Sequence, residues 1–483
     1  MFYEPHGYNI ILEIIIDTRW CNVMYHIDFN QPANLYFIGI GGISMSGFAE
    51  LLLSKGFKIT GSDSVNSTIT EHLESLGIQI FYGQNAANIP NDTDLVVYTA
   101  AISEDNPEYS EAVRRGLPMM VRAEMIGQIM KNYPNAIAVS GTHGKTTTTS
   151  ILTHIFLEAE KDPTVSVGGM LDIIGGNIRI GSSGNWIMEA CEYTNSFLHF
   201  FPTTSIILNI EEDHLDFFKD INDIRNSFHT FAGLLPDDGL LVINHSIDNY
   251  NEITKDVSCK VVTFDLNNRL ADYCADNIAF DENGYSTFDL YVNGTFSASY
   301  HLNVVGKHNI ANCIAALCVA YEQGISPCEI QKGLNNFHGA DRRFQYKGDV
   351  AGITIIDDYA HHPSEIKATL TAALNHKHNR LWCVFQPHTY TRTKAFLKDF
   401  ANSLSIADKV IVTDIYAARE KDPGDISGKD LERELLLLGA DAIYISDFDD
   451  IENFILKNCV KGDLLITMGA GNVVDIGEEL LSF

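Results

Sequence analysis

Residues 136–152 read AIAVSGTHGKTTTTSIL, and this stretch decides the fold of the middle of the chain. Its first five residues form an apolar run typical of a buried strand, and a helix is expected after Lys145. A glycine loop, residues 141–147, lies between them. The order of strand, glycine loop and helix predicts a phosphate-binding loop, because the amides of such a loop face the phosphates.

The loop itself predicts ATP binding. Lys145 would place a positive charge at the terminal phosphate, and the hydroxyl of Thr146 could reach magnesium. The spacing is two residues shorter than the common GxxxxGK[ST] pattern and therefore indicates a subclass. A chance glycine turn with a surface lysine is the alternative, and the strand and helix around the loop argue against it. The candidate ATP-binding residues here are Gly141, Thr142, His143, Gly144, Lys145, Thr146 and Thr147.

Composition limits the class of protein. The 483 residues suit two to four domains, and an apolar share of 45% supports several hydrophobic cores. A formal charge of −30 repels nucleic-acid phosphates, so no nucleic-acid partner is expected. Nine scattered cysteines without a CxxC pair indicate a reducing compartment. No apolar run is long enough for a membrane helix, so we expect a cytoplasmic protein without membrane insertion.

The alternation of strand and helix patterns predicts an α/β protein of three domains. Residues 24–128 open with a strand, a glycine loop and a helix, as in a Rossmann-like domain. Residues 129–339 hold the phosphate-binding loop and, from about 261 to 300, short alternating strands that predict a mixed sheet. Residues 340–483 alternate again and predict a second Rossmann-like domain. We interpret residues 1–23 as an N-terminal extension without functional role.

Acidic residues and a histidine follow two strands of the middle domain. Glu189 and Glu192 lie at the end of one strand, and His214 follows the next. Side chains at adjacent strand ends meet at the edge that also carries the phosphate loop, so these three are candidate metal ligands. Each of them alone would more often belong to a solvated loop.

The first glycine loop resembles the GxGxxG pattern, with Ser44 where the third glycine belongs, and Asp63 follows at the distance expected for a ribose contact. It could hold any diphosphate-linked nucleoside. The candidate residues are Gly39, Gly41, Gly42, Ser44, Met45, Ser46 and Asp63.

Two polar clusters follow strands of the third domain, at residues 357–363 and 386–393. One such cluster could be surface decoration. Two at equivalent positions favour a binding site.

Nine segments in series carry a resemblance to a known family. They are GIGGISMSG, GTHGKTTTT, EACEYTNSF, NIEEDH, GKHNIANCIAA, ADRRFQ, DDYAHHPSE, FQPHTYTRT and MGAGN. In this order they resemble the Mur ligase family, and in particular its members that add L-alanine to UDP-N-acetylmuramate. The resemblance runs from about Met24 to the end of the chain.

The resemblance implies an activity. The N-terminal domain would bind the UDP-sugar, the central domain ATP, and the C-terminal domain the amino acid. ATP would phosphorylate the lactyl carboxylate of UDP-N-acetylmuramate, and the amine of L-alanine would attack the acyl phosphate. The protein would use ATP as co-substrate with two Mg²⁺ ions, as a monomer or dimer.

Residue roles follow from the resemblance, position by position. Thr146 and Glu189 would hold one magnesium ion and His214 a second, with Glu192 as an alternative ligand. Asn309 and Asn312 would meet the adenine, and Arg342 or Arg343 would close on the nucleotide with Asp358. The implied amino-acid pocket is Tyr359, His361, His388 and Arg392, and the implied catalytic residues are Lys145, His361 and Arg392.

Two positions depart from the family pattern. Thr389 stands where some relatives have a second arginine, and Ser44 replaces the usual third glycine.

Three other functions remain open. The nearest alternative is the related recycling ligase, which joins a preformed tripeptide to the same sugar. A nicotinamide-dependent oxidoreductase and a non-catalytic nucleotide-binding regulator are alternatives from other classes, but they leave Lys145 and the acidic cluster without a role.

Overall fold

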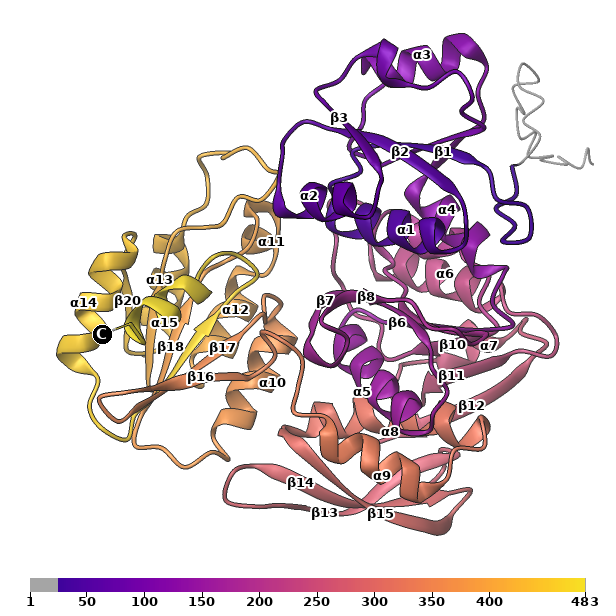
Figure 1. Ribbon diagram of the computed structural model, residues 1–483. Helices are drawn as coiled ribbons and strands as arrows, with labels where there is room; N and C mark the ends of the chain where they lie inside the picture. Colours follow the sequence, from indigo (N-terminus) through magenta and orange to yellow (C-terminus); the bar gives the residue numbers. More distant parts are fainter. Residues whose placement is uncertain (1–24, 483) are drawn as a thin grey trace, which may run out of the picture. The chain divides into compact units, whose positions relative to one another are not determined.

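Three β-sheets organise residues 25–482, which a computed structural model of the chain describes (Figure 1). The described chain divides into two units, the first ending at Met125 and the second starting at Ile126. The first unit holds one sheet and the second holds two. The proposed extension at residues 1–23 lies outside the described residues.

The first unit is a parallel sheet in the order β3-β2-β1-β4-β5. The strand order reverses beside β1, and the first glycine loop leaves β1 there, at the kind of switch point where open α/β sheets bind ligands. The strands are β1 Asn34–Ile38, β2 Lys58–Asp63, β3 Gln79–Tyr82, β4 Leu95–Tyr98 and β5 Met119–Val121; the helices are α1 Ile43–Ser54, α2 Thr68–Ser75, η1 Ala86–Asn88 and α3 Pro107–Arg115, with α4 Arg122–Met130 at the division.

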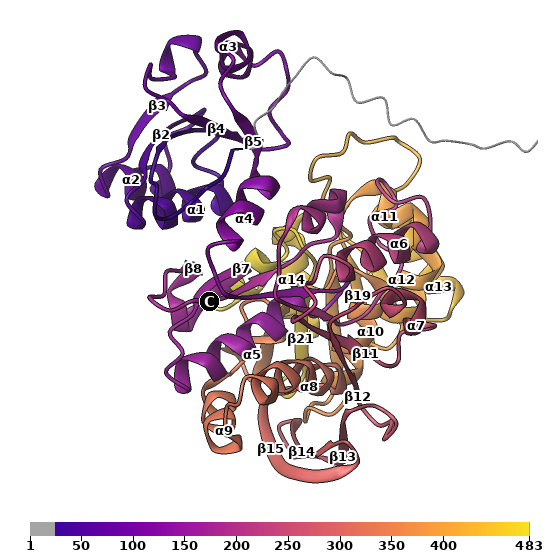
Figure 2. The same cartoon turned by 90° about the vertical axis from the view of Figure 1, so that its right-hand side faces the viewer.

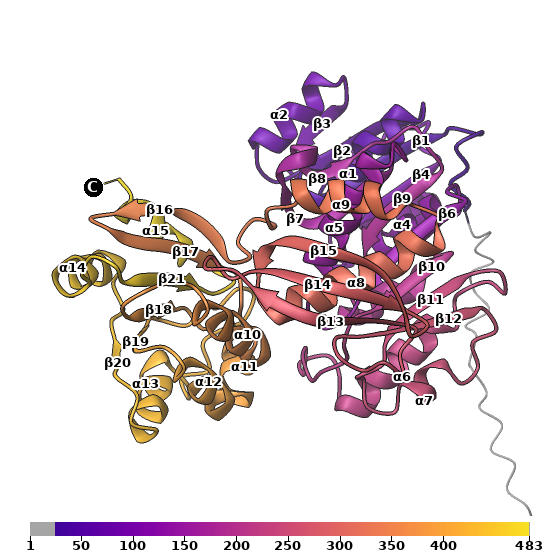
Figure 3. The ribbon, with the colours of Figure 1, turned by 90° about the horizontal axis from the view of Figure 1, so that it is seen from below.

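The central domain carries a ten-stranded sheet in the order β15-β14-β13-β12-β11-β10-β6-β9-β7-β8. Strands β13, β14 and β15 run antiparallel side by side, which Figure 3 shows, so the predicted mixed sheet is confirmed. The strands are β6 Asn135–Ser140, β7 Thr164–Leu171, β8 Gly176–Arg179, β9 Asn185–Glu189, β10 Thr204–Ile207, β11 Leu240–Asn244, β12 Lys260–Asp265, β13 Tyr273–Phe280, β14 Tyr285–Val292 and β15 Thr295–Val305.

Three helices of this domain pack against one another, α5 with both α8 and α9 (Figure 2). Helix α8 is rich in alanine, cysteine and isoleucine and is buried over most of its length. Gly333 of α9 allows a close approach, because a Cβ there would lie 2.7 Å from the Cα of Ile155 in α5. The helices are α5 Lys145–Glu158, η2 Asp172–Ile174, η3 Tyr193–His199, α6 Ile221–Ala232, α7 Tyr250–Thr254, α8 Lys307–Glu322 and α9 Pro327–Asn336.

The C-terminal domain has a six-stranded sheet in the order β16-β17-β21-β18-β19-β20. All its pairings are parallel except that of the edge strand β16 with β17. Its elements are β16 Gln345–Val350, β17 Ile353–Asp358, α10 Pro363–Ala373, β18 Leu381–Phe385, α11 Tyr390–Ala395, α12 Leu397–Leu404, β19 Lys409–Val412, α13 Gly428–Leu437, β20 Ala442–Tyr444, α14 Phe448–Asn458, β21 Leu464–Met468 and α15 Val474–Leu480.

The predicted three-domain α/β architecture is therefore confirmed, while the boundaries proposed at 128 and 340 stay predictions. The antiparallel strand β16 was not predicted, because its sequence, QYKGDV, is polar and has only one residue at each end that favours a strand. Among residues 25–482, no helix is both long enough and apolar enough to cross a membrane.

Candidate active site

The phosphate loop joins β6 to α5, as predicted. Gly141 and Gly144 have φ angles of 138° and 84°, a region that favours glycine. A Cβ at Gly144 would also collide with the side chain of Asn312 on α8. The loop conformation therefore requires glycine and places the loop against one of the residues predicted to meet the nucleotide.

Asn209 holds the loop from the neighbouring strand end. Its Oδ1 accepts a hydrogen bond from the backbone N–H of His143 at 2.8 Å, and its Nδ2 donates to the carbonyl of the same residue at 3.1 Å. This two-point contact fixes the middle of the loop to the end of β10.

Lys145 lies at the first turn of α5 and turns back over the loop. Its ammonium donates to the carbonyl of Gly141, to that of Thr142 at 3.0 Å and to Oε2 of Glu192 at 3.1 Å. Burial opposes the charge of Lys145, but Glu192 and the other negative groups around it raise its pKa above the usual value. The lysine therefore carries its positive charge where the loop would bind phosphate.

The predicted metal ligands lie around this lysine, and their chemistry fits a divalent cation. Oε1 of Glu189 is buried without a hydrogen-bond partner among the described residues. A buried carboxylate oxygen of this kind is costly unless a cation binds it. Glu192, by contrast, pairs with Lys145, and its Oε1 lies 4.0 Å from Nε2 of His214. Of the two glutamates, Glu189 is thus the one with a free oxygen.

A cavity of about 260 Å³ opens beside the loop. It is lined by predicted ATP-binding residues together with residues that were not predicted. The predicted ones are His143, Gly144, Thr146, Thr147, Asn309, Asn312, Arg343 and Asp358; among the others are Asn209, Asn244, Phe264, His308 and Phe344.

The two neighbouring arginines have different surroundings. Arg342 donates to the buried carboxylate of Asp357 at 2.8 Å and to the carbonyls of Gly469 and Gly471, all in the C-terminal domain. Arg343 lines the cavity instead. Of the alternatives left open by the sequence, Arg343 is the one placed to contact a nucleotide.

Asp358 is buried at the end of β17. Burial raises its pKa to about 6, although Arg343 and the amides of Phe344 and Ala360 act in the opposite direction. Those amides donate to its two oxygens at 2.8 and 2.7 Å. Asp358 therefore orders the backbone on both sides of the cavity wall.

The predicted amino-acid pocket comes together where the C-terminal domain meets the central domain. Nε and Nη2 of Arg392 donate to Oδ1 of Asp213 at 3.1 and 2.9 Å, and Nη1 contacts Nδ1 of His388 at 3.1 Å. These contacts use three of the five N–H groups of a guanidinium and leave two. Arg392 can therefore bind a carboxylate while it remains paired with Asp213. Burial opposes the charge of Asp213, but Arg392 and nearby histidines lower its pKa.

His361 and His388 are neutral imidazoles in this pocket. Burial lowers the pKa of each to about 4. Nδ1 of His361 lies 2.9 Å from the carbonyl of Tyr359, which can only accept, so Nε2 carries the lone pair. The rings of Tyr359, His361, His388 and Tyr416 follow one another with centroids 5.4 to 5.8 Å apart. Three of the predicted residues therefore lie in one row of rings, and the fourth, Arg392, contacts His388.

Thr389 takes a structural position in this pocket. It has a φ of 65°, and its hydroxyl accepts from the amide of Arg392 at 3.4 Å as the N-cap of α11. The amide of Thr389 donates to the carbonyl of Tyr416 at 2.9 Å. The residue therefore orients the helix turn that carries Arg392.

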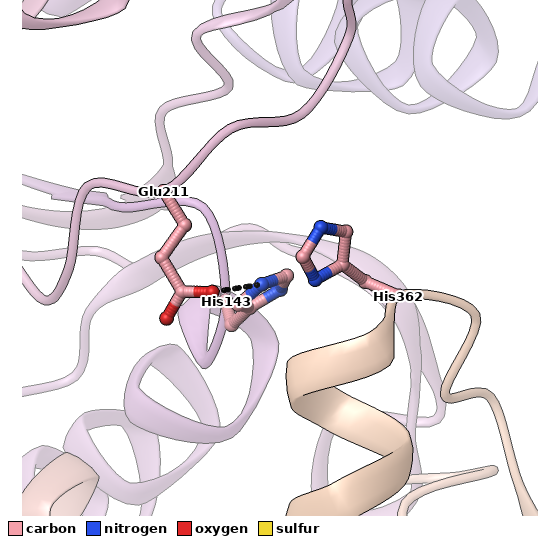
Figure 4. Close-up of side chains that lie close together, drawn as sticks. All are labelled: His143, Glu211 and His362. Atoms are coloured by element: carbon pink, nitrogen blue, oxygen red, sulfur yellow. Dashed lines mark ion pairs between the residues drawn. The ribbon is translucent and has the colours of Figure 1, made fainter. Parts of the chain in front are cut away.

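A second group of ionisable side chains lies at the same domain contact (Figure 4). Nδ1 of His143 is 3.2 Å from Glu365, and its Nε2 is 3.5 Å from Glu211. Burial opposes the charge of His143, but Glu365 and Glu211 raise its pKa to about 9. The ring of His362 lies against it, with centroids 4.7 Å apart.

The first glycine loop lies in the first unit. The amide of Gly41 donates to Oδ2 of Asp63 at 2.8 Å, so this carboxylate holds the loop. Met45 is buried in the core, and Oγ of Ser46 donates to the carbonyl of Ile43 at 3.0 Å. Ser44 is half-buried at the start of α1. The sugar-binding role of this loop stays a prediction.

Several residues of the site were missed by the sequence analysis. Asn209 and Asp213 belong to the NIEEDH segment, in which only His214 was given a role, as a candidate metal ligand. Glu365 is the last residue of the DDYAHHPSE segment and the third residue of α10, but it was given no role. His308 lies on α8 within the GKHNIANCIAA segment but was given no role, and Phe264 on β12 belongs to no segment that indicated a function.

Comparison with protein families gives a consistent match along the chain. A model described as the Mur ligase middle domain matches residues 139–320. Models described as the Mur ligase family catalytic domain and the Mur ligase glutamate ligase domain match residues 34–134 and 342–471.

Individual relatives agree with these matches. The UDP-N-acetylmuramate--L-alanine ligase of Lachnoclostridium phytofermentans is 56% identical, over 95% of this chain and 100% of the relative. The protein of the same name from Lachnospira eligens is 54% identical over the same shares. Among solved structures, UDP-N-acetylmuramate-alanine ligase from Thermotoga maritima has a TM-score of 0.76 at 28% identity, covering 93% of this chain and 98% of that one. A murein peptide ligase from Psychrobacter arcticus has a TM-score of 0.66 at 25% identity, with the same coverage.

Proposed function

This chain belongs to the Mur ligase family of ATP-dependent, amide-forming ligases, and we propose that it joins L-alanine to the lactyl carboxylate of UDP-N-acetylmuramate. The reaction yields the amide, ADP and phosphate and serves peptidoglycan precursor synthesis. We place it in the cytoplasm, where ATP and nucleotide sugars are available.

Activation of the carboxylate is the first task, because an amine does not displace an oxygen from a free carboxylate. Transfer of the γ-phosphoryl group of ATP to a carboxylate oxygen makes that oxygen part of a good leaving group. Lys145 stabilises the negative charge of the transferred group, since its ammonium stays charged inside the loop. The nucleotide lies in the cavity beside Gly144, Asn309, Asn312 and Arg343.

Thr146 and Glu189 would hold a magnesium ion, and His214 would be a ligand of a second one. The free, buried oxygen of Glu189 supports this assignment, and the pairing of Glu192 with Lys145 gives Glu192 the role of holding the lysine. When bound, the ion neutralises charge on the phosphates.

The amino acid is recognised at both of its charged ends. The two remaining N–H groups of Arg392 bind its carboxylate, in the bidentate geometry that a guanidinium offers. The neutral His361 accepts a hydrogen bond from the amine through Nε2 and directs it to the acyl phosphate. The observation that carries the proposal is this single arginine, held beside two neutral histidines at the contact between the central and C-terminal domains.

The choice of amino acid is tested with competing acceptors. The protein receives ATP, Mg²⁺ and UDP-N-acetylmuramate with equal amounts of L-alanine, L-serine, glycine and a murein tripeptide, and the sugar products are identified by mass. We expect the L-alanyl product to dominate. A product carrying the tripeptide would assign the chain to the recycling ligases instead.

A further inference from the structure

His143, Glu211 and His362 form a cluster that the ligase reaction does not require as a metal site (Figure 4). His143 belongs to the phosphate loop, Glu211 follows β10, and His362 is the N-cap of α10 in the C-terminal domain. One ligand atom from each lies within 4.8 Å of the other two. We propose that these three side chains bind a divalent transition-metal ion such as Zn²⁺, at a site separate from the magnesium site at Thr146, Glu189 and His214.

The hydrogen bonds of the two imidazoles leave one nitrogen of each for a metal. Nε2 of His362 lies 3.0 Å from the carbonyl of Glu212, which can only accept, so the proton is on Nε2 and the lone pair on Nδ1. That Nδ1 accepts only a long bond of 3.4 Å from the amide of Ser364. Nδ1 of His143 is 3.2 Å from Glu365, while its buried Nε2 lies 3.5 Å from Oε2 of Glu211 and makes no hydrogen bond with the described residues.

The surroundings match those of protein metal sites. Metal-binding histidines usually donate the other ring N–H to a carboxylate or a backbone carbonyl, which fixes the ring. Glu365 does this for His143, and the carbonyl of Glu212 does it for His362. The hydroxyl of Ser364 bonds to Oε2 of Glu211 and orients the third ligand.

The ligand set also selects the kind of ion. Two imidazoles and one carboxylate suit Zn²⁺ and related transition ions, whereas Mg²⁺ prefers oxygen ligands and water. Ligand atoms around a tetrahedral Zn²⁺ lie roughly 3.3 Å apart, a value that follows from metal–ligand bonds of about 2.0 Å. The ligand atoms must therefore approach one another by up to about 1.5 Å, and we expect α10 to move toward the phosphate loop as the ion binds.

Binding has a consequence for the nucleotide cavity. His143 and Glu211 line that cavity, and His362 belongs to the other domain. An ion held by all three ties α10 to the phosphate loop. The metal takes the place of a proton on Nε2 of His143, so one proton leaves as the ion binds. Without an ion, a protonated His143 bridging Glu211 and Glu365 is the alternative state of the cluster.

Binding of Co²⁺ to the chelator-treated protein, in excess Mg²⁺, tests the site without any turnover. We expect one Co²⁺ per chain, with the visible absorption of a site of low coordination number, and displacement by Zn²⁺. His362→Asn should weaken binding by at least about tenfold through loss of a ligand, while asparagine keeps the N-cap of α10. His229→Asn is the matched control, because this histidine of α6 lies beside Asp256, away from the cluster.

The comparison with His214→Asn decides between the two sites. This variant should keep the Co²⁺ spectrum if the proposal is right. Loss of the spectrum in His214→Asn but not in His362→Asn would place the ion at the magnesium site and overturn the proposal. A thiolate-to-cobalt band, or no binding at all, would overturn it as well; the last result would leave a protonated His143 as the bridge. None of these outcomes depends on ligase activity, so the proposed function is tested separately.

Discussion

Lys145 and Glu192 form an ion pair in which each side chain is at least four-fifths buried. Lys145→Ala should lower phosphate release at least about 100-fold, because the transferred phosphoryl group loses its positive charge. UDP-sugar binding should survive. Near-normal turnover in this variant, measured as phosphate release, would contradict the role given to the lysine.

The loss of stability in Lys145→Ala is separated from its loss of activity by a second variant. Removal of Lys145 leaves Glu192 buried without its partner, which costs about 3–5 kcal/mol in comparable pairs. The double variant Lys145→Ala, Glu192→Gln should regain thermal stability but not phosphate release. Recovery of both would mean that the lysine acts through folding alone.

His143 predicts a pH dependence of stability. Its pKa of about 9 lies above the ordinary value of 6.5, so the folded state favours the charged form. The stabilisation is complete below pH 6.5 and is lost as the pH rises through 9. It amounts to about 3 kcal/mol at most. Melting temperatures of the chelator-treated protein between these pH values should fall more for the wild type than for His143→Asn; equal slopes would contradict the predicted charge.

The residues that could be predicted from the sequence are those whose chemistry depends on a local pattern. The phosphate loop is of this kind, because glycines, lysine and threonine stand at fixed spacing between a strand and a helix. Asp213 could not be predicted as the partner of Arg392, because 179 residues separate them. Likewise, the choice between Arg342 and Arg343 depends on which of them Asp357 binds, and only the fold decides that.

At the scale of elements, the close packing of α5 and α9 rests on Gly333. Gly333→Ala should destabilise the protein by about 1–3 kcal/mol, because the new methyl group meets the backbone of Ile155 at 2.7 Å. Gly233→Ala, whose nearest neighbour would lie at an ordinary 3.4 Å, is the control and should have little effect. Urea unfolding curves compare the two; similar midpoints would show that the helices adjust freely.

Elements were predictable where their hydrophobic pattern was strong. Strands β6, β17 and β18 are short apolar runs next to turn residues, and β6 occurs where it was expected, directly before the glycine loop. The edge strand β16 has a polar sequence, because one side of it faces no other strand. Its place in the sheet comes from pairing with β17, which local sequence does not encode.

At the scale of the molecule, Arg392 and Asp213 connect the C-terminal domain to the central domain. Arg392→Lys should raise the KM for L-alanine about tenfold or more, because lysine cannot pair with Asp213 and bind a carboxylate in the same fork-like geometry. The KM for ATP should change little. Arg433→Lys, in an exposed pair with Asp430, is the control. An unchanged KM for L-alanine would remove Arg392 from the amino-acid pocket.

In the proposed reaction, ATP activates the carboxylate of the sugar as an acyl phosphate. The most direct measurement uses UDP-N-acetylmuramate with ¹⁸O in its lactyl carboxylate, together with ATP, Mg²⁺ and L-alanine, and determines the mass of the released phosphate. We expect each phosphate to carry one ¹⁸O, because the oxygen leaves with the phosphoryl group when the amine attacks. Phosphate released without ¹⁸O would mean that water hydrolyses ATP and that no acyl phosphate forms.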